Sequence, residues 1–237
     1  MTASQRPPKA LYQLDERLRS YVNASESSHI VETAETIFYA QGGGQPSDTG
    51  CITKKLRSDQ KSVRFDVEAV RHGKQGRILH LVTGEDIADS LHPGDLVEQR
   101  VDGIRRDLNS RAHTAGHIVG LAVRKLVEQT PELSVSELKA SHFPDACFVE
   151  FKGLIDGKHK AAIQEQVSKY VKDALPIELS WYPPGDFGTH SVATTEGAYP
   201  CGGARVPDTS YVRELVIKGI KRQKGISKVS HAIADTV

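Results

Sequence analysis

The stretch NSRAHTAGHIVGLAVRKLVEQ, residues 109–129, decides the fold, because here short strand-like runs give way to a helical pattern. Asn109 or Ser110 suits the N-cap, where a short polar side chain accepts a hydrogen bond from a free backbone N–H. Pro131 cannot continue a helix and is expected just beyond its end. Apolar residues recur on one face of this predicted helix, at Ile118, Leu121, Ala122 and Leu126. We therefore expect this face to be buried.

The chain before this helix is typical of β structure. Runs of alternating or β-branched residues are separated by segments that contain turn formers such as Gly, Pro and Asp. This spacing predicts a small β-barrel or sandwich, and we assign a β-barrel-like domain to residues 10–103 and a disordered tail to residues 1–9. The expected strands lie within 29–39, 62–71, 76–82 and 95–102, with turns at 42–50, 71–76 and 91–95.

The chain after the helix alternates strands with one further helix. A helix is expected at 157–176, and strands at 145–153, 177–182, 212–217 and 227–233. This order predicts an α+β domain of residues 104–237, with helices over an antiparallel sheet.

Composition is that of a globular protein. The 237 residues are 38% hydrophobic and 26% charged, and the net charge of +1 neither requires nor excludes a nucleic-acid partner. Three cysteines, Cys51, Cys147 and Cys201, are too few for a disulfide framework. We find no signal-peptide pattern and no apolar window long enough to span a membrane. A reduced, cytoplasmic protein with no membrane partner is expected.

Two histidines, His113 and His117, lie four residues apart on the predicted helix. Such residues share a face with their Cβ atoms about 5–6 Å apart, so both imidazoles can bind one cation. A packed, hydrogen-bonded pair is the alternative. Gly116 and Gly120 each weaken a helix by roughly 1 kcal/mol, which is easier to understand if something approaches this face closely. The other eight histidines, His142 among them, lack such spacing and are expected to face solvent or to pack.

Cys201, in the sequence PCGGARV, is either a buried structural cysteine or a third, loop-borne ligand. Two imidazoles and a thiolate suit Zn²⁺, and an open fourth position is typical of catalytic zinc. Arg205 follows four residues later and cannot bind a metal.

The sequence GGGQPSDTG, residues 42–50, has two interpretations. It is either a flexible turn or a segment whose glycines let the backbone approach a ligand closely, with the amide of Gln45 beside it to donate and accept hydrogen bonds. Basic residues form either an ordinary solvated surface or a phosphate-binding rim. They are Arg100, Arg105, Arg106 and Arg111, with five further cations in 218–228.

Four ordered motifs resemble those of freestanding alanyl-tRNA editing proteins of the AlaX type, which are related to the editing domains of alanyl- and threonyl-tRNA synthetases. They are FYAQGGGQPSDTG (38–50), RAHTAGHI (111–118), ASHFPDACFVEFKG (140–153) and PCGGARV (200–206). The resemblance extends from about residue 10 to residue 233. It implies a glycine-motif β-barrel followed by an α+β editing domain that holds one Zn²⁺ per chain.

The family pattern pairs HxxxH with a downstream CxxxH, so the resemblance implies that His113, His117 and Cys201 are metal ligands. The fourth ligand would stand at 205, where this chain has arginine. Water or a substrate atom is our preferred fourth ligand, and Asp208 and His190 are alternatives. The resemblance further implies a substrate-binding role for Gly42, Gly43, Gly44 and Gln45, and we add Thr114.

The implied activity is metal-dependent hydrolysis, in trans, of the ester in Ser-tRNA(Ala) or Gly-tRNA(Ala), with the acceptor end of tRNA(Ala) as partner. Gln45 and Arg205 are the candidate catalytic residues, Gln45 at the serine-sensing pocket and Arg205 on the terminal phosphate or the carbonyl. Because Arg205 replaces a ligand, two alternatives stay open. One is a divergent enzyme acting on a small aminoacyl compound without tRNA, and the other is a non-catalytic binding module.

Overall fold

The computed structural model describes residues 8–13, 28–55, 62–181, 190–194 and 197–234. Contacts divide the chain into two compact units. Unit 1 comprises Met1–Gly42 and Pro46–Arg106, and unit 2 comprises Gly43–Gln45 and Asp107–Val237. The last three residues of the GGGQ motif therefore pack with the second unit.

Unit 1 is built on one antiparallel sheet of order β1-β2-β5-β4-β3-β6. A short helix, α2 (Ile87–Ser90), and a 3₁₀ turn, η1 (Lys74–Gly76), connect its strands. Residues 1–7 of the expected tail lie outside the described residues, and the first strand begins at Pro8. The strands are β1 (Pro8–Gln13), β2 (His29–Thr33), β3 (Gly50–Lys55), β4 (Ser62–His72), β5 (Ile78–Thr83) and β6 (Val97–Val101).

The expected β-barrel is wrong, because within the described residues β1 and β6 remain the edges of an open sheet. Its apolar face is covered by Phe38 in the loop after β2 and by Ile87 in α2, so the sheet need not close on itself. A side chain of the edge strand β6 also contacts this region: Nε2 of Gln99 donates hydrogen bonds to Thr33 Oγ1 and to Glu35 O. An alternating strand pattern reports a buried face but not what covers it.

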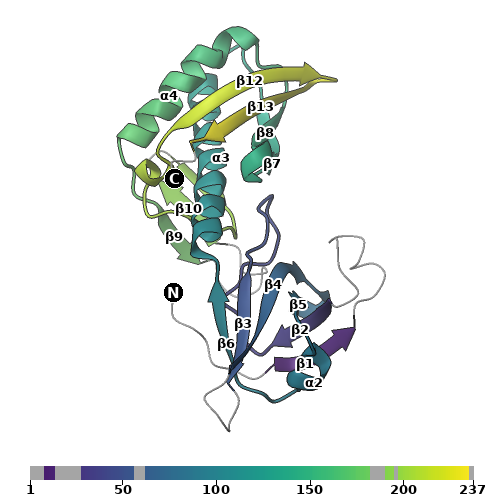
Figure 1. Ribbon diagram of the computed structural model, residues 1–237. Helices are drawn as coiled ribbons and strands as arrows, with labels where there is room; N and C mark the ends of the chain where they lie inside the picture. Colours follow the sequence, from purple (N-terminus) through teal and green to yellow (C-terminus); the bar gives the residue numbers. More distant parts are fainter. Residues whose placement is uncertain (1–7, 14–27, 56–61, 182–189, 195–196, 235–237) are drawn as a thin grey trace. The chain divides into compact units, whose positions relative to one another are not determined.

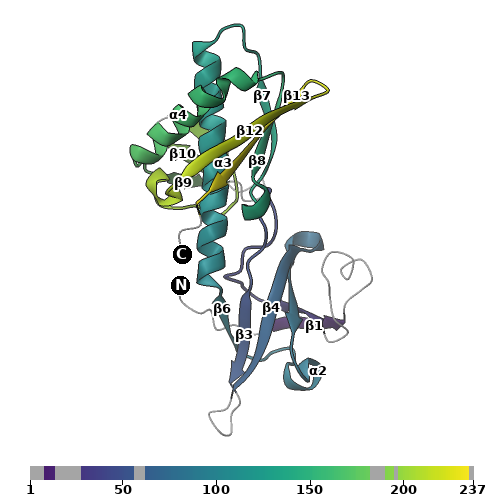
Figure 2. The ribbon, with the colours of Figure 1, turned by 45° about the horizontal axis from the view of Figure 1, so that its top comes forward.

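Unit 2 contains a sheet of order β12-β13-β8-β7 and a smaller sheet of order β11-β10-β9. Neighbouring strands in both sheets run antiparallel. Two long helices and several 3₁₀ turns complete the unit (Figures 1 and 2). The elements are α3 (Gly103–Gln129), β7 (Ser136–Ser141), η2 (Pro144–Ala146), β8 (Phe148–Lys152), η3 (Gly157–His159), α4 (Lys160–Lys172), β9 (Glu178–Trp181), β10 (His190–Thr194), β11 (Gly197–Pro200), η4 (Thr209–Val212), β12 (Leu215–Gln223) and β13 (Ile226–Ile233).

Helix α3 begins at Gly103, earlier than the predicted cap at Asn109 or Ser110. The reason is Asp102, whose Oδ1 accepts hydrogen bonds from Ile104 N (3.0 Å) and Arg105 N (3.1 Å) and so caps the helix upstream of both predicted caps. Asn109 and Ser110 are buried within the helix instead.

The core of unit 2 confirms the prediction of helices over an antiparallel sheet. Helix α3 crosses behind the β12–β13 hairpin in both views (Figures 1 and 2). The two helices and the sheet contribute to one apolar cluster, which includes Ile118, Leu121, Ala122, Val149, Ile163, Val167, Ile217 and Val229. None of the helices among the described residues is long and apolar enough to cross a membrane.

Candidate metal centre

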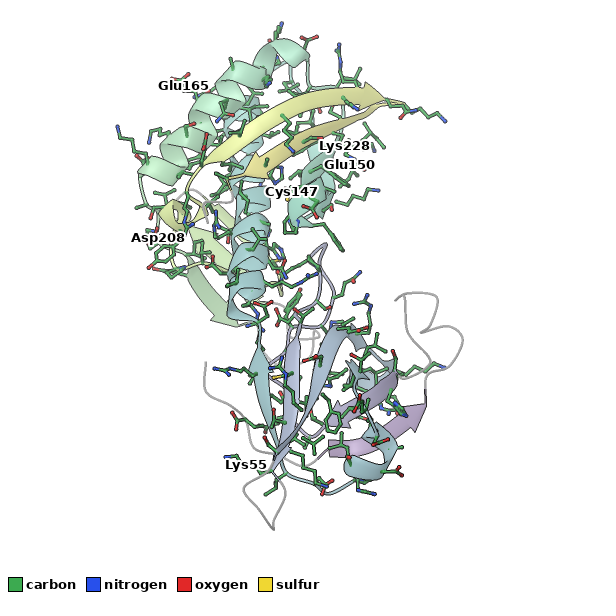
Figure 3. The ribbon with its side chains drawn as sticks, in the orientation of Figure 1. Lys55, Cys147, Glu150, Glu165, Asp208 and Lys228 are labelled. Carbon is green, nitrogen blue, oxygen red and sulfur yellow. The ribbon has the colours of Figure 1, made fainter. Side chains whose placement is uncertain are left out.

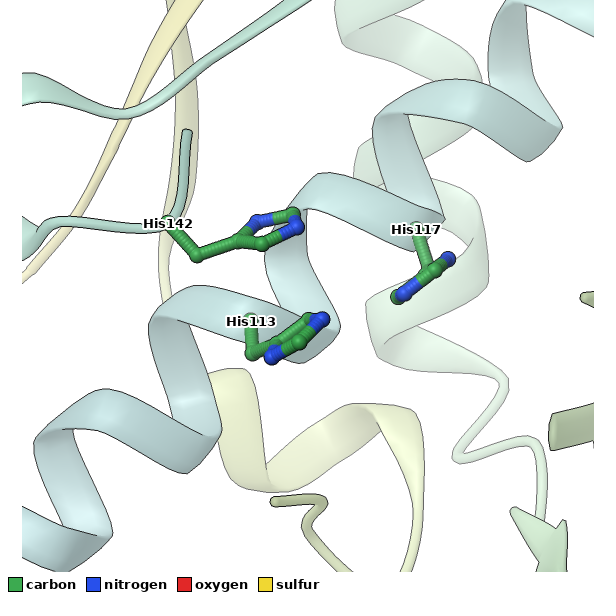
Figure 4. A group of neighbouring side chains, drawn as sticks. All are labelled: His113, His117 and His142. Atoms are coloured by element: carbon green, nitrogen blue, oxygen red, sulfur yellow. The ribbon is translucent and has the colours of Figure 1, made fainter. Parts of the chain in front are cut away.

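Helix α3 presents His113 and His117 on one face, with His113 buried and His117 half-buried. Their rings stack with centroids 5.3 Å apart and an interplanar angle of 10° (Figure 4). The i, i+4 spacing thus produces the predicted juxtaposition.

A third imidazole, that of His142, lies directly after β7 and stacks on His113 with centroids 3.9 Å apart (Figure 4). Its backbone N donates to Gly44 O at 2.8 Å, which ties this segment to the GGGQ motif. The expectation that His142 is a solvent-facing or packing residue missed this cluster, because the residue comes from a strand end and has no ligand-like spacing. The detectable signal was Gly116: a Cβ there would lie 2.3 Å from Cε1 of His142.

The cluster of His113, His117 and His142 brings three ligand atoms within 4.8 Å of one another, so it could hold a metal ion. Burial is the main cause that lowers the pKa of all three rings, and the positive charge of Arg205 adds to it. The pKa of His142 falls to about 3. The rings are therefore neutral near pH 7, which is the form that binds metals.

Gln45 sets the orientation of His113. Its Oε1 accepts hydrogen bonds from Nδ1 of His113 at 2.6 Å and from the backbone N of Ala204 at 3.0 Å. Because Nδ1 carries the proton, Nε2 of His113 keeps its lone pair. Gln45 is fully buried, so its contact is with the histidine and the loop.

Cys201 lies beside the cluster, with its Sγ 3.2 Å from Nε2 of His113. The loop that carries it approaches the histidine closely, since a Cβ on Gly203 would lie 1.9 Å from Cε1 of His113. The thiol is half-buried. Three imidazoles and one adjacent thiol form a donor set that fits a transition metal such as zinc.

Arg205 enters the same site. Its Nη2 donates to Nε2 of His117 at 2.9 Å. The guanidinium cannot bind a metal, and it occupies the lone pair of one of the two ring nitrogens of His117. The residue that replaces the expected fourth ligand is thus in contact with another member of the ligand set.

Other predicted site residues make contacts of their own. Gly42 belongs to unit 1, where its carbonyl accepts from Tyr39 Oη. Thr114 Oγ1 donates to Ser110 O and accepts from Val206 N, which links α3 to the Cys201 loop. Asp208 caps η4 through Ser210 N. The side chain of His190 lies outside the described residues.

The backbone of Gly44 lies against β7 with φ of +75°. A Cβ there would lie 2.5 Å from Ala140 O, so only glycine fits. The motif is therefore a fixed close approach of two backbones. Gly43 belongs to the same tripeptide of unit 2.

Two of the arginines considered for a phosphate-binding rim are engaged within the protein. Arg106 forms an ion pair with the buried Asp48. Arg111 is buried, and its Nη2 donates to Ala234 O. At these two positions neither alternative, solvated surface or phosphate-binding rim, describes the side chain, because both guanidiniums bind groups of the protein.

The chain is 35% identical to the alanyl-tRNA editing protein AlaX-M of Methanosarcina barkeri over 175 residues, which are 72% of this chain and 68% of that protein. It is also similar to alanine–tRNA ligases. The ligase of Thermotoga maritima is 32% identical over 67% of this chain, and that of Natronomonas pharaonis is 24% identical over 89% of it. These matches span 17% and 23% of the ligases. No protein-family model matches the chain. The extent and identity of the first match show that the chain belongs to the AlaX-type alanyl-tRNA editing proteins.

Proposed function

We propose that this protein is a metal-dependent deacylase that hydrolyses the ester of Ser-tRNA(Ala), and of Gly-tRNA(Ala), in trans. The observation that carries the proposal is the cluster of His113, His117 and His142, whose ligand atoms lie within 4.8 Å of one another. Membership of the AlaX family supports the reaction class. The cytoplasm is the compartment where this reaction would be needed.

The three imidazoles and the Cys201 thiolate would hold the metal, and water or the ester would add as a fifth ligand. Zn²⁺ is the ion that this donor set favours. Such an ion polarises an ester carbonyl or activates water. Gln45 keeps the proton of His113 on Nδ1 and so leaves Nε2 as the donor atom. We assign Gln45 a positioning role, because its buried side chain acts through His113 and the Ala204 backbone.

Arg205 is proposed as the residue that contacts the substrate. Its guanidinium must leave Nε2 of His117 before that nitrogen binds a metal. A planar cation with several N–H donors then suits the ester carbonyl or the phosphate of the terminal nucleotide. Gly43, Gly44 and Thr114 are proposed to shape the pocket, with Gly42 at the edge of the motif, and the acceptor end of tRNA(Ala) is the proposed partner.

Serine differs from alanine by one hydroxyl. A pocket that hydrogen-bonds this hydroxyl can reject the alanyl ester strongly, whereas an apolar pocket discriminates poorly between the two. The test is deacylation of Ser-tRNA(Ala) beside Ala-tRNA(Ala) by the metal-loaded protein. We expect hydrolysis of the first only. His113→Ala, His142→Ala and Cys201→Ser should each abolish it, whereas His92→Ala at an exposed site should not.

Equal hydrolysis of both charged tRNAs, or none by a protein with full metal content, would contradict the proposal. A non-catalytic role is the second candidate, and the contact between Arg205 and His117 favours it. Elemental analysis after purification without chelators separates the two, since stoichiometric metal supports the enzyme and its absence supports the binding module.

A further inference from the structure

The sheet β12-β13-β8-β7 has one face in the apolar core and one that carries polar side chains. Inward residues such as Val149 and Val229 join the core with α3 and α4. Their strand neighbours point to the other face, because successive side chains alternate. The strand register places Lys139, Glu150, Lys228 and Lys221 in one row across the four strands on this outer face.

This outer face carries an excess of positive charge. Lys152 follows Glu150 on the same face of β8 and is exposed. We call Lys139, Lys152, Lys221 and Lys228 the lysine face. Among the described residues that the register places on this side, Glu150 is the one acidic side chain, and it pairs with Lys139 at 3.4 Å.

Two of these lysines stand directly opposite each other. Lys221 on β12 faces Lys228 on β13, and like charges in such positions destabilise a strand pair. On β8, Glu150 stands opposite Lys228 and offsets part of this repulsion (both are labelled in Figure 3). Lys228 Nζ lies 3.6 Å from the centroid of the Phe148 ring. A polyanionic ligand that contacts both ammonium groups would relieve the rest of the repulsion.

The lysine face and the histidine cluster lie on opposite sides of the sheet. His142 follows the last residue of β7 and stacks on His113 of α3, which packs on the apolar side. The Ser141–Phe148 pair marks the end of β7 and β8 nearest to His142, and from Phe148 to Lys152 the strand rises about 13 Å. A tRNA whose 3′ end reaches the histidine cluster would therefore have to pass this end of the sheet to meet the lysines.

We propose that the lysine face binds the phosphate backbone of the tRNA whose 3′ end reaches the histidine cluster, an inference that rests on the proposed function. Lysine is a compact point charge that binds phosphate without reading bases. The face would thus add affinity for tRNA in general, and identity would be read elsewhere.

The test measures binding of uncharged tRNA(Ala), so that hydrolysis plays no part. The variant combines Lys139→Gln, Lys152→Gln, Lys221→Gln and Lys228→Gln. The control removes the same charge at Lys125, Lys158, Lys169 and Lys172, which lie on α3, η3 and α4. Circular dichroism and thermal unfolding establish that both variants are folded.

Four lost phosphate contacts should reduce the slope of log K against log salt by about 3 to 4. We expect the lysine-face variant to bind at least about tenfold more weakly at low salt, and the control variant to keep both slope and affinity. Equal slopes for the two variants would overturn the inference, even if deacylation is found. The inference would also be overturned if the lysine-face variant lost as much affinity for polyglutamate as for tRNA. The face would then bind an acidic protein equally well. Failure of deacylation with a retained difference in slope would contradict only the proposed function.

Discussion

The guanidinium of Arg205 donates to Nε2 of His117 across 2.9 Å, so a cation of the protein itself uses a lone pair within the histidine cluster that could hold a metal ion. The same charge helps to lower the pKa of all three clustered histidines. Metal uptake by this cluster would therefore be coupled to the position of Arg205.

Replacing Arg205 should strengthen metal binding. A hydrogen bond to a charged group contributes about 1.5–3 kcal/mol, so Arg205→Met should bind Zn²⁺ about 10- to 100-fold more tightly in a competition titration with a chromophoric chelator. Arg124→Met is the matched control, because Arg124 is an exposed charge near His117. Equal affinity of the Arg205 variant and the wild type would show that the contact does not oppose the metal.

Removing the acceptor of Gln45 should cost both stability and metal affinity. In Gln45→Met, His113 Nδ1 and Ala204 N both lose their partner, and each such loss costs about 1–3 kcal/mol. Metal affinity should fall about 10- to 100-fold, as for other residues that orient a metal ligand. Gln45→Glu keeps an acceptor and should restore part of the loss. Urea unfolding and chelator competition measure the two effects, and unchanged metal affinity in Gln45→Met would refute the positioning role.

Gly116→Ala should be destabilising, although alanine normally favours a helix by about 1 kcal/mol over glycine. The added Cβ would lie 2.3 Å from Cε1 of His142 and displace that ring. We expect weaker metal binding and a lower Tm. Gly103→Ala, in the same helix and with open space around its Cβ, is the control and should show neither effect. A stabilised Gly116→Ala variant with normal metal affinity would place His142 outside the ligand set.

Unit 1 should lose stability as the pH falls below neutrality. Burial lowers the pKa of His80 from 6.5 to about 4, while its ring bonds to Thr36 Oγ1 and Val31 O. In the unfolded chain this histidine takes up a proton near pH 6.5, whereas the folded protein does so only near pH 4, so acid favours unfolding between these values. The loss from pH 7 to pH 5 should be about 2 kcal/mol. Urea unfolding at both pH values should show a smaller loss for His80→Gln, and an undiminished loss for the exposed His92→Gln.

Helical periodicity was sufficient to predict that His113 and His117 share a face, because that relationship is local to one helix. His142 could not be found in this way, since its place depends on how β7 meets α3. Gln45 was recognised as a site residue, but its partner His113 is 68 positions away, and only the tertiary structure identifies that contact. The open sheet of unit 1 was missed for a similar reason, because strand patterns do not reveal that Phe38 and α2 cover the apolar face.

The assignment of Gly43–Gln45 to the second unit has a practical consequence for anyone who wishes to shorten this protein. A fragment that starts at Asp107 would contain the three clustered imidazoles and the Cys201 thiol, yet it would lack the amide that fixes the tautomer of His113. A minimal fragment that keeps this centre therefore needs two separate stretches of the gene, one that encodes Gly43–Gln45 and one that encodes Asp107–Val237. They could be joined by a designed linker or supplied as complementing fragments.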